Sequence, residues 1–203
     1  STFLWVDDKG EVHEIQQGEG GEQGDPLMPA LYSLGQHRAL KLAAARLLPG
    51  EHLFVYFDDL YIVCTKARAA AAFQEVADRV AVDAGVQTHL GTLRAWCSGG
   101  DAAPRDLAAF GPDVWTADLP AERNGIKVLG VPIGTAEYVA ACGCERLTEE
   151  TRLLQELAEL PDTQCAWILL ALSAVPRANH LQRTAPPSMV KEYARKHDDA
   201  LWR

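Results

Sequence analysis

The chain has no long apolar run and no basic, apolar leader at its start. Of its 203 residues, 48% are hydrophobic and 23% are charged, which is typical of a globular protein. The longest apolar stretch, Ala166 to Val175, is about half the length of a bilayer span, so we expect a buried helix and no membrane span. Because a signal peptide is also missing, we expect an intracellular protein.

Cysteine is too sparse and too scattered for a structural metal centre. Cys142 and Cys144 form a close pair, but no second Cys or His pair stands at the spacing of a zinc site. The five cysteines are an odd and unpatterned set, which fits plain thiols in a reducing compartment.

The chain also has fewer basic than acidic residues, with 19 Lys and Arg against 28 Asp and Glu. The formal net charge of −9 argues against a protein that simply coats nucleic acid. The charge is uneven, since from Pro161 onward there are six Lys and Arg but only four Asp and Glu. An acidic body with a mildly basic C-terminal region is compatible with gripping a duplex through one part only.

The pattern of apolar and turn-forming residues predicts an α+β fold. Hairpins are predicted at 3–15, at 53–64, and at 126–133 with a bend at Gly130. Helices are predicted at 26–48, 66–84, 135–160, 163–175 and 187–203, and the stretch 97–124 is predicted to be loop. A boundary near Gly134 would divide a body that contains sheets from an all-α region.

Two details of the predicted helices concern their packing. Asp25 and Pro26 are expected at the N-cap and the first position of the first long helix. Four leucines would line the inner face of that helix, Leu27, Leu31, Leu34 and Leu40. Trp167 and Trp202 lie in helical patterns and are expected to pack in the core or between helices.

Two adjacent carboxylates, Asp58 and Asp59, are the centre of the functional case. They follow Tyr56-Phe57 and separate two apolar runs, 53–57 and 60–64, which predicts a tight hairpin with the Asp pair as its turn. Adjacent carboxylates are costly unless something positive lies beside them. Mg²⁺ prefers such oxygen ligands, and polymerases use carboxylates to hold two metal ions. Taken alone, the pair is better explained by a polar turn, because turns favour Asp.

A second motif, Gln23-Gly24-Asp25-Pro26-Leu27, stands about thirty residues before the Asp pair. Alone it is an ordinary junction between a loop and a helix. Followed by a long helix and by Tyr56-Phe57-Asp58-Asp59 on a hairpin, it resembles the ordered signature of reverse transcriptases, in particular those of non-LTR, LINE-like retrotransposons. The resemblance implies a partial fingers and palm part over 1–134, an antiparallel sheet with packed helices, and an all-α thumb over 135–203.

The resemblance also implies an activity and a set of site residues. It implies an RNA-directed DNA polymerase, a nucleotidyltransferase that uses an RNA template, a DNA primer, dNTP and two Mg²⁺ ions bound by Asp58 and Asp59, in the nucleus or cytoplasm. Next to the template and the nucleotide would lie Gln23, Gly24, Asp25, Pro26, Tyr56 and Phe57. Leu129 and Gly130 would form the primer grip. Phosphate contacts would come from Arg94, Arg177, Arg183 and Lys191, although a solvated surface explains any one of these bases equally well.

The chain departs from the family pattern in two places. The family's first catalytic Asp lies upstream of the glycine-rich loop, which here is predicted at 18–24. Asp7 and Asp8 are not assigned to that role because they lie in a turn. Where the family usually has Lys, the segment Leu90–Trp96 offers Arg94, which is a poor proton donor because it stays protonated.

These departures leave two interpretations open. In the first, the chain is the palm and thumb part of a reverse transcriptase that is incomplete and inactive alone, and that needs an upstream polypeptide segment. In the second, it is a domesticated, catalytically inactive domain that serves as a structural or assembly subunit of a larger complex.

Overall fold

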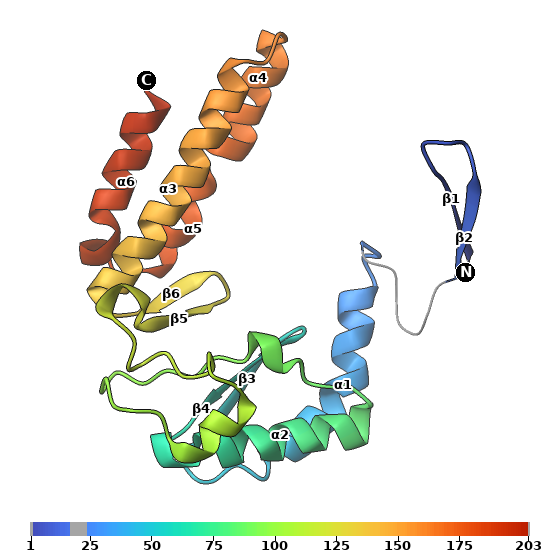
Figure 1. Cartoon of the computed structure of the whole chain (residues 1–203), viewed down its shortest axis with the longest axis vertical. Helices are drawn as coiled ribbons and strands as arrows, with labels where there is room; N and C mark the ends of the chain where they lie inside the picture. Colours follow the sequence, from blue (N-terminus) through green and yellow to red (C-terminus); the bar gives the residue numbers. More distant parts are fainter. Residues whose placement is uncertain (1, 17–23, 203) are drawn as a thin grey trace. The chain divides into compact units, whose positions relative to one another are not determined.

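The computed structural model describes residues 2–16 and 24–202, and it combines helices with small antiparallel sheets (Figure 1). This confirms the predicted α+β class, whereas the finer division into palm and thumb stays a prediction. The chain forms two compact units. The hairpin unit comprises Ser1–Cys64 and Ala72–Thr88, and the helical unit comprises Thr65–Ala71 and His89–Arg203.

The first β-hairpin of the hairpin unit is the one expected near the start of the chain. Strand β1 (Thr2–Val6) pairs antiparallel with β2 (Val12–Gln16). In the turn between them, the Asp7 carboxylate accepts hydrogen bonds from the backbone N–H groups of Lys9 and Glu11, both at 2.9 Å. The side chain of Asp7 therefore closes the turn, as short polar side chains commonly do.

The second β-hairpin packs one of its faces onto two helices. Its strands are β3 (His52–Tyr56) and β4 (Asp59–Val63), and the helices are α1 (Met28–Ala44) and α2 (Ala69–Ala84). Because side chains alternate along a strand, one face of the hairpin supplies apolar groups to a shared core. That core contains Leu40, Ala43, Leu47, Leu53, Leu60, Ile62, Val76, Val80 and Val86.

Helix α1 differs from its sequence prediction in both its start and its buried face. The helix begins at Met28 with Leu27 as the N-cap, so the expected capping by Asp25 and Pro26 is wrong. The buried residues are Gln36, Ala39 and Ala43. Of the four predicted leucines, Leu40 packs against the core, while Leu27, Leu31 and Leu34 are exposed. The leucine pattern misled because small side chains on the opposite face allow α1 to lie close to its neighbours.

In the helical unit, the segment from His89 to Asn124 is irregular apart from short 3₁₀ turns, as predicted for 97–124. It nevertheless has an apolar core, formed by Leu107, Val114, Trp115 and Ala117. The indole N–H of Trp115 donates to the Asp101 carbonyl at 2.9 Å, and that of Trp96 to Asn124 Oδ1 at 2.7 Å. Both indoles satisfy their single donor while their rings pack, which fixes the path of the loop.

The predicted hairpin at 126–133 is present as β5 (Gly125–Val128) and β6 (Val131–Gly134), joined by Leu129 and Gly130. Every described element after Gly134 is helical. The predicted boundary near Gly134, between domains 1–134 and 135–203, stays a prediction. Gly134 itself lies inside the helical unit.

Four α-helices follow β6. Helix α3 (Ala136–Ala158) is capped by the Thr135 side chain, and α4 (Thr163–Leu169) is capped by Asp162. A π-helical turn, Leu170–Ala174, leads to α5 (Arg177–Thr184), which the sequence had not suggested, and α6 (Pro187–Leu201) follows. Among the described residues, no helix is both long and apolar enough to cross a bilayer.

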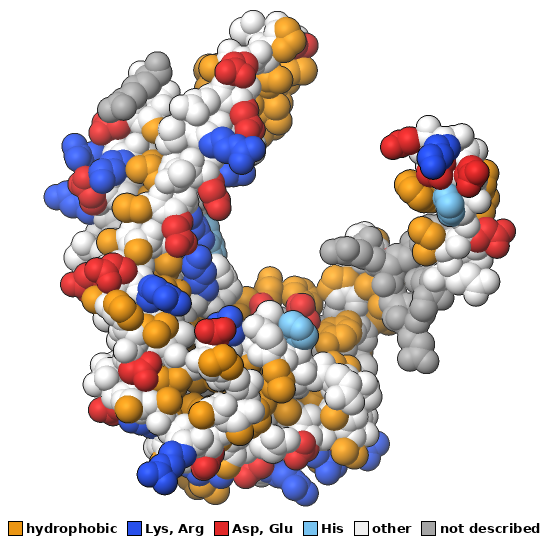
Figure 2. Space-filling model, viewed as in Figure 1, with side chains coloured by type: hydrophobic (Ala, Val, Ile, Leu, Met, Phe, Trp, Pro, Cys, Tyr) orange, Lys and Arg blue, Asp and Glu red, His pale blue; other side chains and the backbone are white. Residues whose placement is uncertain are grey.

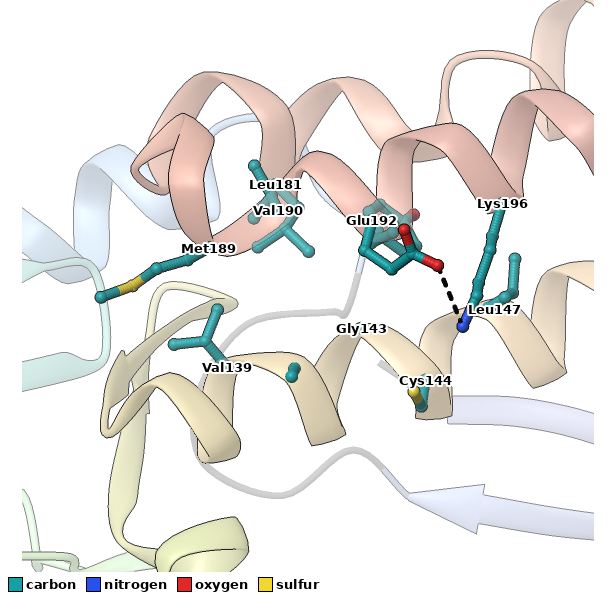
Figure 3. Close-up of a pocket in the computed structure, with 11 residues that line it drawn as sticks. Val139, Gly143, Cys144, Leu147, Leu181, Met189, Val190, Glu192 and Lys196 are labelled. Atoms are coloured by element: carbon teal, nitrogen blue, oxygen red, sulfur yellow. Dashed lines mark ion pairs between the residues drawn. The ribbon is translucent and has the colours of Figure 1, made fainter.

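Helices α3, α5 and α6 share an apolar core. It is formed by Val139, Leu147, Ala178, Leu181, Ala185, Val190 and Tyr193. Figure 3 shows side chains of α3 and α6 on both sides of the contact, with the ion pair between Lys196 and Glu192 beside it. The space left between them is about 60 Å³, which is well below the size of a ligand pocket and marks an ordinary packing gap.

A buried polar cluster links α3 to α6 next to that core. The Glu150 carboxylate accepts a hydrogen bond from the Tyr193 hydroxyl at 2.5 Å and lies 2.9 Å from Nδ1 of His197. Nε2 of His197 lies 3.3 Å from the carbonyl oxygen of Val175. Every member has its partners inside the bundle, which makes a buried polar group tolerable.

The expected burial of Trp167 and Trp202 is wrong. Their side chains are 68% and 89% exposed. Around Trp167 the π-helical turn at Leu170–Ala174 breaks the 3.6-residue period on which the prediction relied. Hydrophobic side chains consequently reach the surface around α4 (Figure 2).

Replacing Glu150 with Ala should unfold the helical unit more easily. The change leaves the buried donors of Tyr193 and His197 without their acceptor, which costs about 3–5 kcal/mol in comparable buried pairs. Urea denaturation followed by circular dichroism measures the change. Glu149→Ala is the matched control, since Glu149 is exposed on the same helix and its loss should cost less than about 0.5 kcal/mol. Equal midpoints for the two variants would contradict the assigned role of the cluster.

The helical unit should also lose stability at alkaline pH. Burial, followed by the hydrogen bond to Glu150, raises the pKa of Tyr193, and burial raises the pKa of Tyr138 to about 12. Above the ordinary tyrosine pKa of about 10, the unfolded chain releases these protons while the folded chain keeps them. Stability therefore falls as pH rises between about 10 and 12. The Tyr138→Phe/Tyr193→Phe double variant should show a shallower fall in denaturation midpoint over this range, and an unchanged slope would refute the assignment.

Candidate functional site

The Asp pair lies at the tip of the β3–β4 hairpin, in a register one residue away from the prediction. Tyr56 pairs with Asp59 across the strands, so the loop consists of Phe57 and Asp58. Asp59 is therefore the first residue of β4, and only Asp58 lies in the turn. The favoured two-residue hairpin loops need a positive φ at their first position, and Phe57 has a φ of 54°.

A left-handed conformation at Phe57 carries a local cost. For a residue with a Cβ atom, this conformation is disfavoured by roughly 1–2 kcal/mol. The amide of Gln36, a buried residue of α1, donates a hydrogen bond of 2.8 Å to the carbonyl of Phe57. The helix that follows the Gly-Asp-Pro segment therefore holds the hairpin tip directly.

Tyr32 lies one turn before Gln36 on α1 and also contributes to the surroundings of the tip. Partial burial raises the pKa of Tyr32, and the negative charge of Asp58 raises it further. The phenol and the carboxylate therefore lie close enough to interact. Sequence reasoning missed both Tyr32 and Gln36, because its leucine pattern assigned the inner face of α1 to the wrong side.

The two carboxylates themselves are exposed, and neither forms an ion pair with another described residue. Asp59 lies on the same face of the hairpin as Tyr56, opposite the face that packs on α1 and α2. Phe54 and Tyr56 on this outer face are 58% and 55% exposed. The tip thus presents two neighbouring negative charges beside uncovered aromatic side chains, an arrangement able to take up a cation through oxygen ligands.

The motif Gln23-Gly24-Asp25-Pro26-Leu27 is only partly described. Gln23 lies outside the described residues, whereas Gly24, Asp25 and Pro26 are described and exposed. Gly24 has a φ of 98°, a conformation that glycine adopts without strain. The Asp25 carboxylate accepts a hydrogen bond of 2.9 Å from the backbone of Leu27. The role of Asp25 in the structure is to form the turn that leads into α1.

The turn predicted as the primer grip is a tight two-residue loop in the helical unit. Val128 pairs with Val131, and the intervening Leu129 and Gly130 have φ values of 49° and 78°. Two successive positive φ values are typical of the type I′ hairpin turn. The turn therefore has one well-defined backbone conformation.

The four predicted phosphate contacts are exposed, and they lie on a loop and two different helices. The Arg94 guanidinium donates to the carbonyls of Leu93 and Gly91, at 2.7 and 3.1 Å, so it folds back onto its own loop. Arg177 and Arg183 are six residues apart on α5 and so point to different sides of it. Lys191 lies on α6.

Another set of candidate metal ligands lies in and beside the turn of the first hairpin. Asp7, Glu11 and His13 place one ligand atom each within 4.8 Å of one another. The Asp7 carboxylate is already engaged, because it interacts with Nε2 of His13 at 3.0 Å and accepts two backbone hydrogen bonds. The hydrogen bond to His13, and then those from the backbone, lower the pKa of Asp7. These contacts explain the cluster as a turn.

Comparison with models of protein families, with curated proteins and with solved structures finds no match to this chain. Function is therefore inferred from the residues and from their geometry.

Replacing Gln36 with Leu should loosen the hairpin tip. The substitution keeps the side chain's bulk in the core but removes the donor to the Phe57 carbonyl, at a cost of about 1–2 kcal/mol. Hydrogen exchange should become faster at the amides of residues 56–60, and the urea midpoint should fall. His37→Ala, at the exposed neighbouring position of α1, should leave both unchanged. Unaltered exchange at the tip in the Gln36 variant would show that the hydrogen bond does not hold the turn.

Proposed function

We propose that the chain is the palm and thumb part of an RNA-directed DNA polymerase of the non-LTR retrotransposon type. The observation that carries this proposal is the hydrogen bond from Gln36 to the carbonyl of Phe57. It joins the helix that follows Gly24-Asp25-Pro26 to the hairpin that presents Asp58 and Asp59. Both motifs therefore belong to one unit, in which the helix that follows the first motif contacts the hairpin tip that carries the second.

The Asp pair fits the two Mg²⁺ ions that this function implies. Asp58 and Asp59 are adjacent, exposed and without an ion-pair partner among the described residues. Hard divalent cations prefer such oxygen ligands and readily share them with water and substrate phosphates. When bound, the ions would promote attack by the primer hydroxyl and stabilise the leaving pyrophosphate.

The residues around the pair would position the substrates. Gln23 and Gly24 would lie against the template and the incoming nucleotide, where a glycine allows the closest approach. Tyr56 and Phe57, whose rings contact edge to face at 4.7 Å between centroids, would form an apolar wall next to the carboxylates. Leu129 and Gly130 would hold the primer end, and Arg177, Arg183 and Lys191 would contact backbone phosphates.

The second hairpin also leaves room for the remaining carboxylate of such a site. Among the described residues, β3 and β4 pair only with each other, and their outer face exposes Phe54 and Tyr56. A further strand with an Asp, from another segment of polypeptide, would pair with an edge of this hairpin and complete the ligand set. The exposed hairpin is thus suited to pairing with an additional strand.

A second candidate function is that of an inactive subunit derived from such an enzyme. The specific observation concerns Arg94, the base nearest to the place where the family usually has Lys and where this chain has Thr92 and Leu93. Its guanidinium is occupied by carbonyls of its own loop. A residue used in this way supports the loop and does not supply a proton, which favours a structural role in a larger complex.

The decisive test is primer extension with Mg²⁺ on an RNA template, using the longest natural form of the protein that contains this chain. Replacing Asp58 or Asp59 with Asn should reduce the rate by about 10²–10³-fold, since each removes a charged metal ligand. Asp113→Asn, an exposed Asp of the helical unit, is the control and should retain full activity.

Mn²⁺ binding to the chain itself separates the two candidate functions. A reverse transcriptase should bind Mn²⁺ at Asp58 and Asp59, and both Asn variants should weaken that binding. Extension activity that survives Asp58→Asn would refute the polymerase proposal. A protein that is inert in extension and binds no Mn²⁺ at the tip would instead favour the inactive subunit.

A further inference from the structure

The turn at Leu129 and Gly130 is held by two side chains from the helices that follow it. The guanidinium Nη2 of Arg146, on α3, donates a hydrogen bond of 2.7 Å to the carbonyl of Gly130. The imidazole Nε2 of His180, on α5, lies 3.1 Å from the carbonyl of Leu129 and donates to it. Both carbonyls of one tight turn are therefore bound by side chains that lie far away in the sequence.

These contacts act on a backbone that needs support. Leu129 has a Cβ atom and a φ of 49°, which is a disfavoured conformation, whereas the φ of 78° at Gly130 is easily adopted. A Cβ added at Gly130 would lie 3.4 Å from the imidazole of His180. The ring thus lies in ordinary packing distance of the turn.

The same region of the helical unit holds charged side chains of both signs. Arg146 and Arg177 both lie near enough to Tyr193 for their charges to act on its hydroxyl. His180 follows Arg177 by one turn of α5, and Lys127 of β5 pairs with Glu145 of α3 at 3.4 Å. Hairpin and helices are therefore joined by several polar contacts, and those from Arg146 and His180 reach the two residues of the turn.

We propose that Arg146 and His180 are positioning residues that hold the Leu129–Gly130 turn in the one conformation that presents the primer terminus. The inference rests on the proposed function, because the primer end gives the turn its role. Arg146 and His180 act through the two carbonyls and need not touch the primer. Helices α3 and α5 thereby fix the place of the turn.

The test uses the whole chain and a primer–template duplex with 2-aminopurine at the primer 3′ end. Its fluorescence reports how the terminal base is held, and anisotropy reports binding of the duplex as a whole. Arg146→Met and His180→Leu each remove one donor. Arg146→Lys and His180→Gln each keep one, and Arg152→Met, exposed on the same helix, is the control for loss of charge.

We expect both donor-removing variants to speed hydrogen exchange at residues 129–131 by about fivefold to tenfold, the effect of one hydrogen bond. Both should lose the primer-end signal of the wild-type chain while the affinity for the duplex changes by less than about threefold. His180→Gln should recover most of the signal. Arg146→Lys should recover part of it, because a lysine ammonium does not reproduce the geometry of a guanidinium.

The outcomes separate the inference from the proposed function. If the wild-type chain does not bind the duplex, the proposed function fails and the inference fails with it. If the wild-type chain binds but Arg146→Met and His180→Leu leave the primer-end signal unchanged, the inference alone fails. Faster exchange with an unchanged primer-end signal would likewise overturn it, since the contacts would then be only structural.

Discussion

The hydrogen bond between the buried amide of Gln36 and the carbonyl of Phe57 is the contact on which the candidate site depends. Without it, the hairpin tip would be an exposed loop with an unfavourable residue in the left-handed region. With it, the tip is fixed to α1, and α1 is fixed by small residues to the core beneath the hairpin. The position of Asp58 and Asp59 is thus set by packing and by one polar contact, although neither carboxylate takes part in either.

The helical unit also has a tight hairpin turn whose carbonyl group is bound by a side chain of a helix. Phe57 and Leu129 are the only non-glycine residues with positive φ among the described part of the chain. Each lies in a two-residue hairpin loop, and the carbonyl of each accepts a hydrogen bond from a helix side chain, Gln36 or His180. Strain in a backbone persists where the surroundings determine it, and such places are frequently functional sites. The sequence resemblance had selected these same two turns.

The sequence predicted the hairpins and most of the helices, because alternation and turn residues are local signals. It located the Asp hairpin to within one residue, but it could not show that Phe57 would accept a left-handed conformation, which depends on Gln36. The leucines of α1 gave the wrong inner face because close packing there relies on Ala39 and Ala43, which carry little hydrophobic signal. Contacts such as that of Arg146 with Gly130 join residues far apart in the chain, and no spacing rule reveals them.

Asp58 and Asp59 are exposed, and this exposure limits the explanations for two acids at the hairpin tip. A buried pair would have to be balanced for the protein to fold, whereas hydrated carboxylates at an exposed turn cost little. Their presence therefore contributes little to folding, and a turn with Gly or Asn at its loop position would form more readily than one with Phe57. A strained loop with two exposed acids, one in it and one at the start of β4, neither with an ion-pair partner among the described residues, is poorly explained by stability. The proposed binding of a cation and of a nucleic-acid end at this tip would explain it.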